Sequence, residues 1–318
     1  MNHRDRLPQL DGELFLTDGG IETVLIFHEG LDLPLFAAFD LLKDEAGTER
    51  LRRYYAPYLA LARERGVGFV LESPTWRASP RWAAEIGYDD EALGHLNREA
   101  IALLERIRSK HADDGPPIVI SGCVGPQDDA YNPAQLLSAE AAEDYHATQV
   151  ATFATTAADM VTAITMAYVE EAIGVARAAA RTDMPAAISF TVETDGRLPS
   201  GQPLGEAIEQ VDAQTGASPA YFMINCAHPT HFETVLEHAD PWRERIRGLR
   251  ANASTKSHAE LDEATELDEG DPADLGSRYA ALREKLPQLN VLGGCCGTDH
   301  RHIAEIRDAW LAGADQLR

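Results

Sequence analysis

The sequence is poor in positive charge and has no long apolar run. Its 318 residues include 28 Lys and Arg against 52 Asp and Glu, so the formal net charge is -24 at pH 7. Such a surface repels the phosphates of nucleic acids and anionic lipid headgroups, so we expect neither nucleic acid nor a membrane as partner. No stretch of about twenty apolar residues is present, and therefore no membrane span is predicted.

Cysteine is also scarce, with four residues in the whole chain. This number is too small for a disulfide framework, and there is no C-x-x-C pair of the kind used in dithiol redox motifs and paired structural zinc sites. The first residues, 1–6, are polar and contain no apolar core of a signal peptide. We therefore expect a cytoplasmic protein, whose thiols stay reduced and can bind metal.

The usual nucleotide-binding motifs are absent as well. No G-x-G-x-x-G opens a helix after the first apolar run, and no G-x-x-x-x-G-K-[ST] loop occurs. What the chain does contain is a regular alternation of apolar runs with helical stretches. We predict strands at residues 14–17, 67–71, 117–121, 160–165, 185–190, 221–224, 246–250 and 289–292. Eight such units predict a single (β/α)₈ barrel domain over residues 1–318, with a doubly wound sheet as the rival.

Helices are predicted between these runs, at residues 44–65, 80–112, 138–158, 169–181, 204–214, 229–238, 277–286 and 299–312. We expect the first of them to be kinked or broken at Pro57. The stretch 256–274 is acidic and low in apolar residues, and it is predicted to be a long loop.

In a barrel of this type, functional side chains lie where the strands end and the following loops begin. The residues that the sequence places there are polar or thiol-bearing. They are Asp18, Glu72, Thr75, Cys123, Thr165, Glu193, Cys226, Asn252, Cys295 and Cys296.

Three of these residues are thiols that follow two strands. Cys226 ends the sixth, and Cys295 with Cys296 follows the glycine pair that ends the eighth. The ends of both strands face the same mouth of the barrel. Three thiolates can hold Zn²⁺ and leave a fourth position open for a substrate, and glycines let the backbone turn tightly around an ion. Buried free thiols or a vicinal disulfide are the alternatives.

Five motifs together resemble the homocysteine S-methyltransferase family, in the same order and over nearly the whole chain. They are Thr17-Asp18-Gly19-Gly20, Gly122-Cys123-Val124-Gly125-Pro126, Ile224-Asn225-Cys226, Ala251-Asn252 and Gly293-Gly294-Cys295-Cys296-Gly297-Thr298. The resemblance implies a (β/α)₈ barrel and a zinc ion held by three cysteines. It also implies transfer of a methyl group to the sulfur of homocysteine, which yields methionine. The matching zinc ligands are Cys226, Cys295 and Cys296.

The same resemblance implies a catalytic role for Asp18, which matches an Asp of the family. The predicted substrate-binding residues are Asp18, Glu72, Thr75, Arg77, Thr165, Glu193 and Asn252. The chain departs from the family at Ile164, because a Glu that holds the amino group of the substrate usually occupies the end of strand four. Arg77 also adds a positive charge near the mouth, which would suit an acceptor that carries a carboxylate.

We therefore predict a zinc-dependent S-methyltransferase that takes a methyl group from a sulfonium or betaine-type donor. Its small-molecule acceptor is a thiol, with homocysteine as the first candidate. The alternatives are a methyltransferase for another thiol, and a non-catalytic zinc or redox thiol protein. Nothing in the sequence resembles an added folate or cobalamin domain, and the sequence identifies neither the donor nor the oligomeric state.

Overall fold

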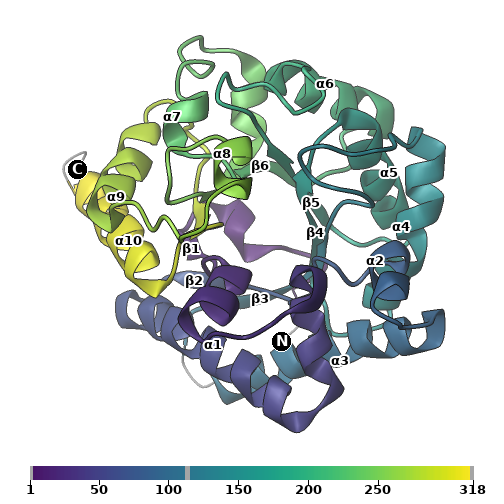
Figure 1. The fold of residues 1–318 in the computed structure, drawn as a ribbon. Helices are drawn as coiled ribbons and strands as arrows, with labels where there is room; N and C mark the ends of the chain where they lie inside the picture. Colours follow the sequence, from purple (N-terminus) through teal and green to yellow (C-terminus); the bar gives the residue numbers. More distant parts are fainter. Residues whose placement is uncertain (1–2, 112–114, 316–318) are drawn as a thin grey trace.

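Eight parallel strands form a closed barrel in the computed structural model, which describes residues 3–111 and 115–315. The strands follow one another in chain order, and the last pairs with the first. Figure 1 shows the strands at the centre and the helices around them. The predicted (β/α)₈ barrel is thus confirmed. Its strands are β1 (Phe15–Leu16), β2 (Gly68–Glu72), β3 (Ile118–Val124), β4 (Met160–Met166), β5 (Ala186–Thr191), β6 (Tyr221–Asn225), β7 (Ile246–Ala251) and β8 (Val291–Gly294).

The helices that connect the strands are α1 (Glu45–Arg65), α2 (Pro80–Glu85), α3 (Asp90–Lys110), α4 (Ala139–Ala154), α5 (Val169–Ala180), α6 (Leu204–Thr215), α7 (Pro229–Phe232), α8 (His258–Asp262), α9 (Pro272–Leu282) and α10 (His300–Asp315). Short 3₁₀ or π turns lie at Pro8–Asp11, Thr23–His28, Pro34–Phe36, Ala38–Lys43 and Pro241–Arg245. Among the described residues, no helix has the length and apolar character needed to cross a membrane.

The strands are apolar because both of their faces are covered. Every residue of β2, β3, β4, β5 and β6 is buried, as expected for a parallel sheet with helices outside and side chains inside. Inside the barrel, Phe15, Val70, Met160 and Tyr221 pack together near the amino ends of their strands. Leu7 joins this cluster, so the N-terminal segment covers the end of the barrel opposite the site described below.

The predictions about two helical regions need correction. Helix α1 runs without the predicted break through Pro57. The stretch 256–274 is not one loop, because it contains α8 and the start of α9. Each of these helices has an N-terminal cap: Ser257 and Glu260 form a reciprocal capping box at α8, and the Asp271 carboxylate accepts backbone N–H bonds at α9. Capping by polar side chains satisfies the free N–H groups of a helix start without an apolar pattern.

Several helix boundaries also differ from the prediction. The helix expected at 229–238 is one short turn, α7, and the helix expected to reach residue 158 ends at Ala154. Helix α9 begins before the predicted residue 277. The predicted end of a helix at Ala112 lies outside the described residues. Helix ends carry weak local signals and vary by a residue or two even between assignments.

The unbroken α1 leads to a prediction about stability. A proline inside a helix leaves the carbonyl four residues earlier, here that of Arg53, without its intrahelical N–H donor, at a cost of about 3 kcal/mol relative to alanine. Proline returns about 1 kcal/mol by restricting the unfolded chain. We expect Pro57→Ala to raise the free energy of unfolding by about 2 kcal/mol in a urea titration.

Pro272 is a matched control, because it lies in the first turn of α9, where proline suits the backbone. Pro272→Ala should not stabilise the protein. Equal effects of the two substitutions would contradict the strain that we assign to Pro57.

Candidate active site at the carboxyl ends of the strands

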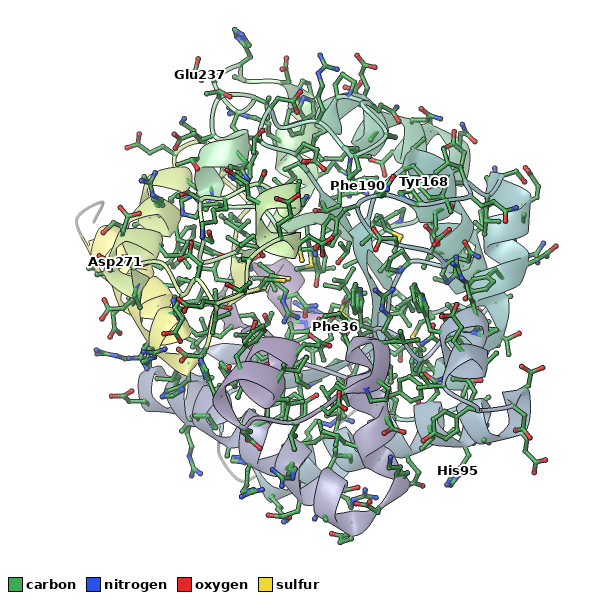
Figure 2. All side chains as sticks on the ribbon, viewed as in Figure 1. Phe36, His95, Tyr168, Phe190, Glu237 and Asp271 are labelled. Carbon is green, nitrogen blue, oxygen red and sulfur yellow. The ribbon has the colours of Figure 1, made fainter. Side chains whose placement is uncertain are left out.

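A cavity of about 420 Å³ opens at the carboxyl ends of the strands. Its walls come from segments far apart in the chain, including Phe36, which Figure 2 shows over the centre of the barrel mouth. The predicted site residues that line it are Asp18, Glu72, Arg77, Thr165, Cys226, Asn252, Cys295 and Cys296. Cys123 and Ile164 line it as well.

The three thiols singled out in the sequence lie together in this cavity. The Sγ atoms of Cys226, Cys295 and Cys296 are within 4.8 Å of one another. Cys226 is buried, whereas Cys296 is exposed to the cavity mouth. Three thiolates bound to one tetrahedral zinc ion would have their sulfur atoms about 3.8 Å apart. The thiol set therefore fits Zn²⁺ after a small contraction, with a fourth position free.

A strained turn presents Cys226 to the cavity. Cys226 has φ 53° and Thr165, near the end of β4, has φ 66°, which is the left-handed region that side chains other than glycine rarely adopt. The side chain of Asn225 supports this geometry. Its Oδ1 accepts from the Thr165 backbone N–H at 3.0 Å, and its Nδ2 donates to Thr165 Oγ1 at 2.8 Å. Backbone strain held by surrounding bonds is typical of functional sites.

Asn252 connects the two segments that carry the thiols. Its Nδ2 donates to the Cys226 carbonyl at 2.9 Å, and its Oδ1 accepts from the Cys296 backbone N–H at 3.0 Å. Asn252 is almost completely buried, so both bonds are shielded from water. One amide thus fixes the separation of Cys226 from the cysteine pair.

The glycines beside the thiols are required by close backbone approach. A Cβ atom at Gly20 would lie 2.6 Å from the Cys295 carbonyl oxygen, and one at Gly293 would lie 1.9 Å from Thr17 Oγ1. The loop after β1 therefore packs directly on the loop after β8. No side chain fits between them, which explains the paired glycines at the start of the first loop and at the end of β8.

The thiol cluster itself favours ionisation of one member. Hydrogen bonds from Cys295 and Cys296 hold the pKa of Cys226 well below its usual value. The same hydrogen bonds, together with the negative charge of Cys226, raise the pKa values of Cys295 and Cys296. Burial raises the pKa of Cys123 well above its usual value, so that thiol stays protonated. A divalent cation would displace the remaining two protons of the cluster.

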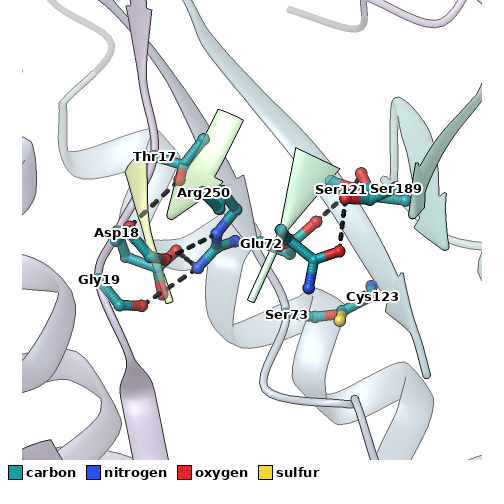
Figure 3. A network of polar contacts seen from close by, with 12 residues as sticks. Thr17, Asp18, Gly19, Glu72, Ser73, Ser121, Cys123, Ser189 and Arg250 are labelled. Atoms are coloured by element: carbon teal, nitrogen blue, oxygen red, sulfur yellow. Dashed lines mark hydrogen bonds and ion pairs between the residues drawn. The ribbon is translucent and has the colours of Figure 1, made fainter. Parts of the chain in front are cut away.

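A buried ion triad lies on the β1, β2 and β7 side of the cavity. Arg250 donates to Asp18 Oδ1 at 2.7 Å through Nη2 and pairs with Glu72 Oε2 through Nη1; Figure 3 shows its guanidinium between the two carboxylates. It also donates to the carbonyls of Gly294 and Gly19. Burial raises the pKa of Glu72 to about 6, although Arg250 counteracts this effect.

The sequence analysis missed Arg250, because the run 246–250 was interpreted only as a buried strand. A cation within an otherwise apolar strand was the signal, since a buried charge needs a partner. Asp18 has both carboxylate oxygens occupied, because Oδ2 accepts from Tyr54 at 2.8 Å. Asp18 and Glu72 therefore hold Arg250 in place.

Two further cavity residues were also missed. Glu22 lines the cavity, and burial raises its pKa to about 7. Tyr131 lines it as well, with its ring 4.0 Å from that of His258, and burial together with the neighbouring thiols raises its pKa well above the usual value. Glu22 directly precedes the helical turn Thr23–His28 and Tyr131 lies in the segment between β3 and α4, and neither belongs to a sequence motif.

Two predicted site residues, Thr75 and Glu193, do not line the cavity. The Thr75 hydroxyl is fully buried and donates to the Cys123 carbonyl at 2.7 Å. The Glu193 carboxylate lies 3.3 Å from His258 Nδ1, and the other ring nitrogen of His258 is 2.5 Å from the Cys226 carbonyl. Each residue thus supports a cavity wall from behind.

Comparisons with known proteins place the chain in a family. The model of the homocysteine S-methyltransferase family matches residues 15–310. A comparison with curated protein sequences gives no match. Among solved structures, the chain is similar to the oxidised form of the homocysteine methyltransferase MmuM from Escherichia coli, with a TM-score of 0.74, 20% identity, and coverage of 97% of this chain and 99% of that one.

The metallated form of the same Escherichia coli protein is also similar, with a TM-score of 0.70, 19% identity, and coverage of 95% of this chain and 98% of that one. At this level of identity the structures support the fold, and the family match supports the class of reaction. The chain therefore belongs to the homocysteine S-methyltransferase family and is a methyltransferase.

Proposed function

We propose that this methyltransferase binds Zn²⁺ through Cys226, Cys295 and Cys296 and methylates a small-molecule thiol. The convergence of three Sγ atoms within 4.8 Å at one cavity carries the proposal. The family match and the likeness to a metallated relative support it. When bound, zinc would stabilise the thiolate form of the substrate, which keeps its sulfur nucleophilic at neutral pH.

Methyl transfer forms a bond between the acceptor sulfur and the methyl carbon and breaks the bond between that carbon and the donor. The acceptor loses its S–H proton to water, its sulfur forms a bond to the methyl carbon, and the donor leaves with the electron pair of its broken bond to that carbon. Homocysteine is our first candidate for the acceptor, and the product would then be methionine. A donor with a sulfonium or quaternary ammonium centre supplies a neutral leaving group. Cytoplasmic location stays a prediction, which rests on the need for reduced thiols.

Arg250 has a definable role in this proposal. It donates to the carbonyl of Gly294, which directly precedes Cys295, and its charge opposes the rise in the pKa of the Cys295 thiol that the hydrogen bond with Cys226 causes. Three cysteinates and a substrate thiolate carry four negative charges against the two positive charges of zinc. A nearby guanidinium reduces this excess charge, and Asp18 and Glu72 hold it in position.

A different thiol acceptor is the second candidate, and Ile164 favours it. Its side chain lines the cavity and is 7% exposed, at the position where the family resemblance leads us to expect a Glu. An ammonium group beside an isoleucine loses hydration without gaining a partner. The site therefore provides little stabilisation for the amino group of homocysteine at this position.

Removal of one thiol tests the metal assignment. We expect Cys295→Ala to lose bound zinc and methyl transfer together, because two thiolates do not hold the ion tightly in an open site. Metal analysis and a transfer assay with S-methylmethionine and homocysteine measure both. Cys123→Ala, which removes a protonated thiol from the same cavity, should keep the zinc. Full zinc occupancy in Cys295→Ala would contradict the ligand set.

Neutralising Asp18 tests the ion triad. Asp18→Asn leaves Arg250 with one carboxylate, so we expect a loss of about 1–3 kcal/mol in the free energy of unfolding and a fall in kcat/KM for the thiol acceptor. Zinc content should be unchanged. If zinc is lost while the KM for the acceptor stays the same, Asp18 belongs to the metal site.

Restoring an acidic side chain at Ile164 tests acceptor choice. Ile164→Glu should raise kcat/KM for homocysteine relative to 4-mercaptobutyrate, which lacks the amine, by about tenfold, or 1.4 kcal/mol. Ile164→Gln has nearly the same shape without the charge and should give less than half of this gain in free energy. An unchanged ratio in Ile164→Glu would show that the amino group is bound elsewhere in the cavity.

A further inference from the structure

Arg77 is a buried cation that packs against two aromatic rings. Its guanidinium carbon lies 4.0 Å from the ring centroid of Trp76 and 3.6 Å from that of Trp82. Arg77 is 7% exposed and lines the same cavity as the three thiols. The rings take up the space beside the guanidinium carbon, so a ligand is expected to bind the N–H groups of the guanidinium.

These N–H groups have no partner within the described part of the chain. The Nε and Nη1 atoms of Arg77 are buried and unbonded, and no ion pair involving Arg77 forms there, in contrast to Arg250, which has two. Burial lowers the pKa of Arg77 to about 10, so the group is charged at neutral pH. An unpaired buried charge is costly to keep, which indicates that an anion from outside the chain completes the site.

Hydrogen bonds hold the segment around Arg77 in place. The Trp82 indole donates to the Pro126 carbonyl at 3.1 Å, and the Ala78 carbonyl accepts from Asn97 at 3.1 Å. The Ala78 backbone N–H also bonds to the Thr75 carbonyl at 2.9 Å. A preorganised guanidinium loses little entropy on binding, which favours specific recognition of an anion.

The position of Arg77 suits one end of an extended substrate. Arg77 follows β2 and Cys226 follows β6, and these two strands lie opposite each other in the ring of eight. A substrate whose reacting sulfur or methyl group lies at the thiols can therefore reach Arg77 with its far end. The cavity, at about 420 Å³, is of the size that holds small-molecule ligands.

We propose that Arg77 is an anion subsite that binds the carboxylate of one of the two substrates; this inference rests on the proposed thiol methyl transfer. A planar carboxylate matches the in-plane N–H groups of a guanidinium. Glu22 and Asp129 are the acidic groups whose charges act on Arg77, and neither reaches ion-pair distance. The carboxylate belongs either to the thiol acceptor or to the onium donor.

Matched substrates distinguish the two sources. The acceptors are 3-mercaptopropionate and 3-mercapto-1-propanol, and the donors are dimethylsulfoniopropionate and dimethyl(propyl)sulfonium. Arg77→Met keeps the length of the side chain and removes the charge. We expect it to lower kcat/KM at least tenfold for the carboxylate-bearing member of one pair and by less than about twofold for its uncharged partner. The pair that responds identifies which substrate Arg77 binds.

Arg283 supplies a matched control. Its guanidinium carbon lies 4.2 Å from the ring centroid of Trp310, and burial lowers its pKa as well, but it does not line the cavity. Arg283→Met should leave both substrate ratios unchanged. Arg77→Lys keeps a charge without the planar edge, and it should retain part of the preference for carboxylates.

Binding measured without turnover separates this inference from the proposed function. The effect of 3-mercaptopropionate and of dimethylsulfoniopropionate on the Tm of the zinc-loaded protein is measured. In the wild type, at least one of them should raise the Tm more than its uncharged partner does. In Arg77→Met, this difference should disappear. Such a shift without methyl transfer would support the anion subsite and contradict the proposed function. If Arg77→Met lowers kcat/KM equally for charged and uncharged substrates, or leaves kcat/KM unchanged for all of them, the proposal of an anion subsite is wrong.

A test on the unaltered protein covers the case in which Arg77→Met does not fold. Propionate should inhibit transfer competitively against the carboxylate-bearing substrate, whereas 1-propanol at the same concentration should not. Equal inhibition by both compounds, or by neither, would contradict the proposal.

Discussion

Closure of the barrel between β8 and β1 is the constraint on which the site depends. The pairing of Phe15 with Val291 and of Leu16 with Leu292 places the loops after these strands against each other. The distance between the loops is so short that Gly20 and Gly293 have no space for a Cβ atom. This contact positions the segment that carries Cys295 and Cys296, and Asn252 then sets its separation from Cys226.

The two arginines that line the cavity differ in the partners that compensate their buried positive charge. Arg250 is fully satisfied by Asp18, Glu72 and two backbone carbonyls, so it is part of the framework beside the thiols. Arg77 packs against two indole rings, and its Nε and Nη1 atoms have no hydrogen-bond partner among the described residues. The first arrangement stabilises charge that the chain itself provides, and the second is suited to charge that arrives with a ligand.

Much of the fold could be predicted because its signals are local. Each strand is a short apolar run, and each long amphipathic stretch is a helix, so periodicity alone places most elements in order. The errors occurred where polar caps replaced apolar pattern, as at Ser257 before α8, or where tertiary packing overrode propensity. Pro57 is of the second kind: it lies in α1 between Tyr54 and Tyr58, whose side chains are buried, and this packing holds the helix together through the proline.

By itself, the sequence determined the barrel, the three thiols and the family, since these depend on apolar periodicity and on short motifs that a linear reading detects. Only the tertiary structure decided what the charged residues do. It paired Asp18 and Glu72 with Arg250, turned Thr75 and Glu193 away from the cavity, and left Arg77 unpaired between two tryptophans. The reason is physical: the role of a charge depends on its burial and on its partners in space, and these come from segments that lie far apart in the chain.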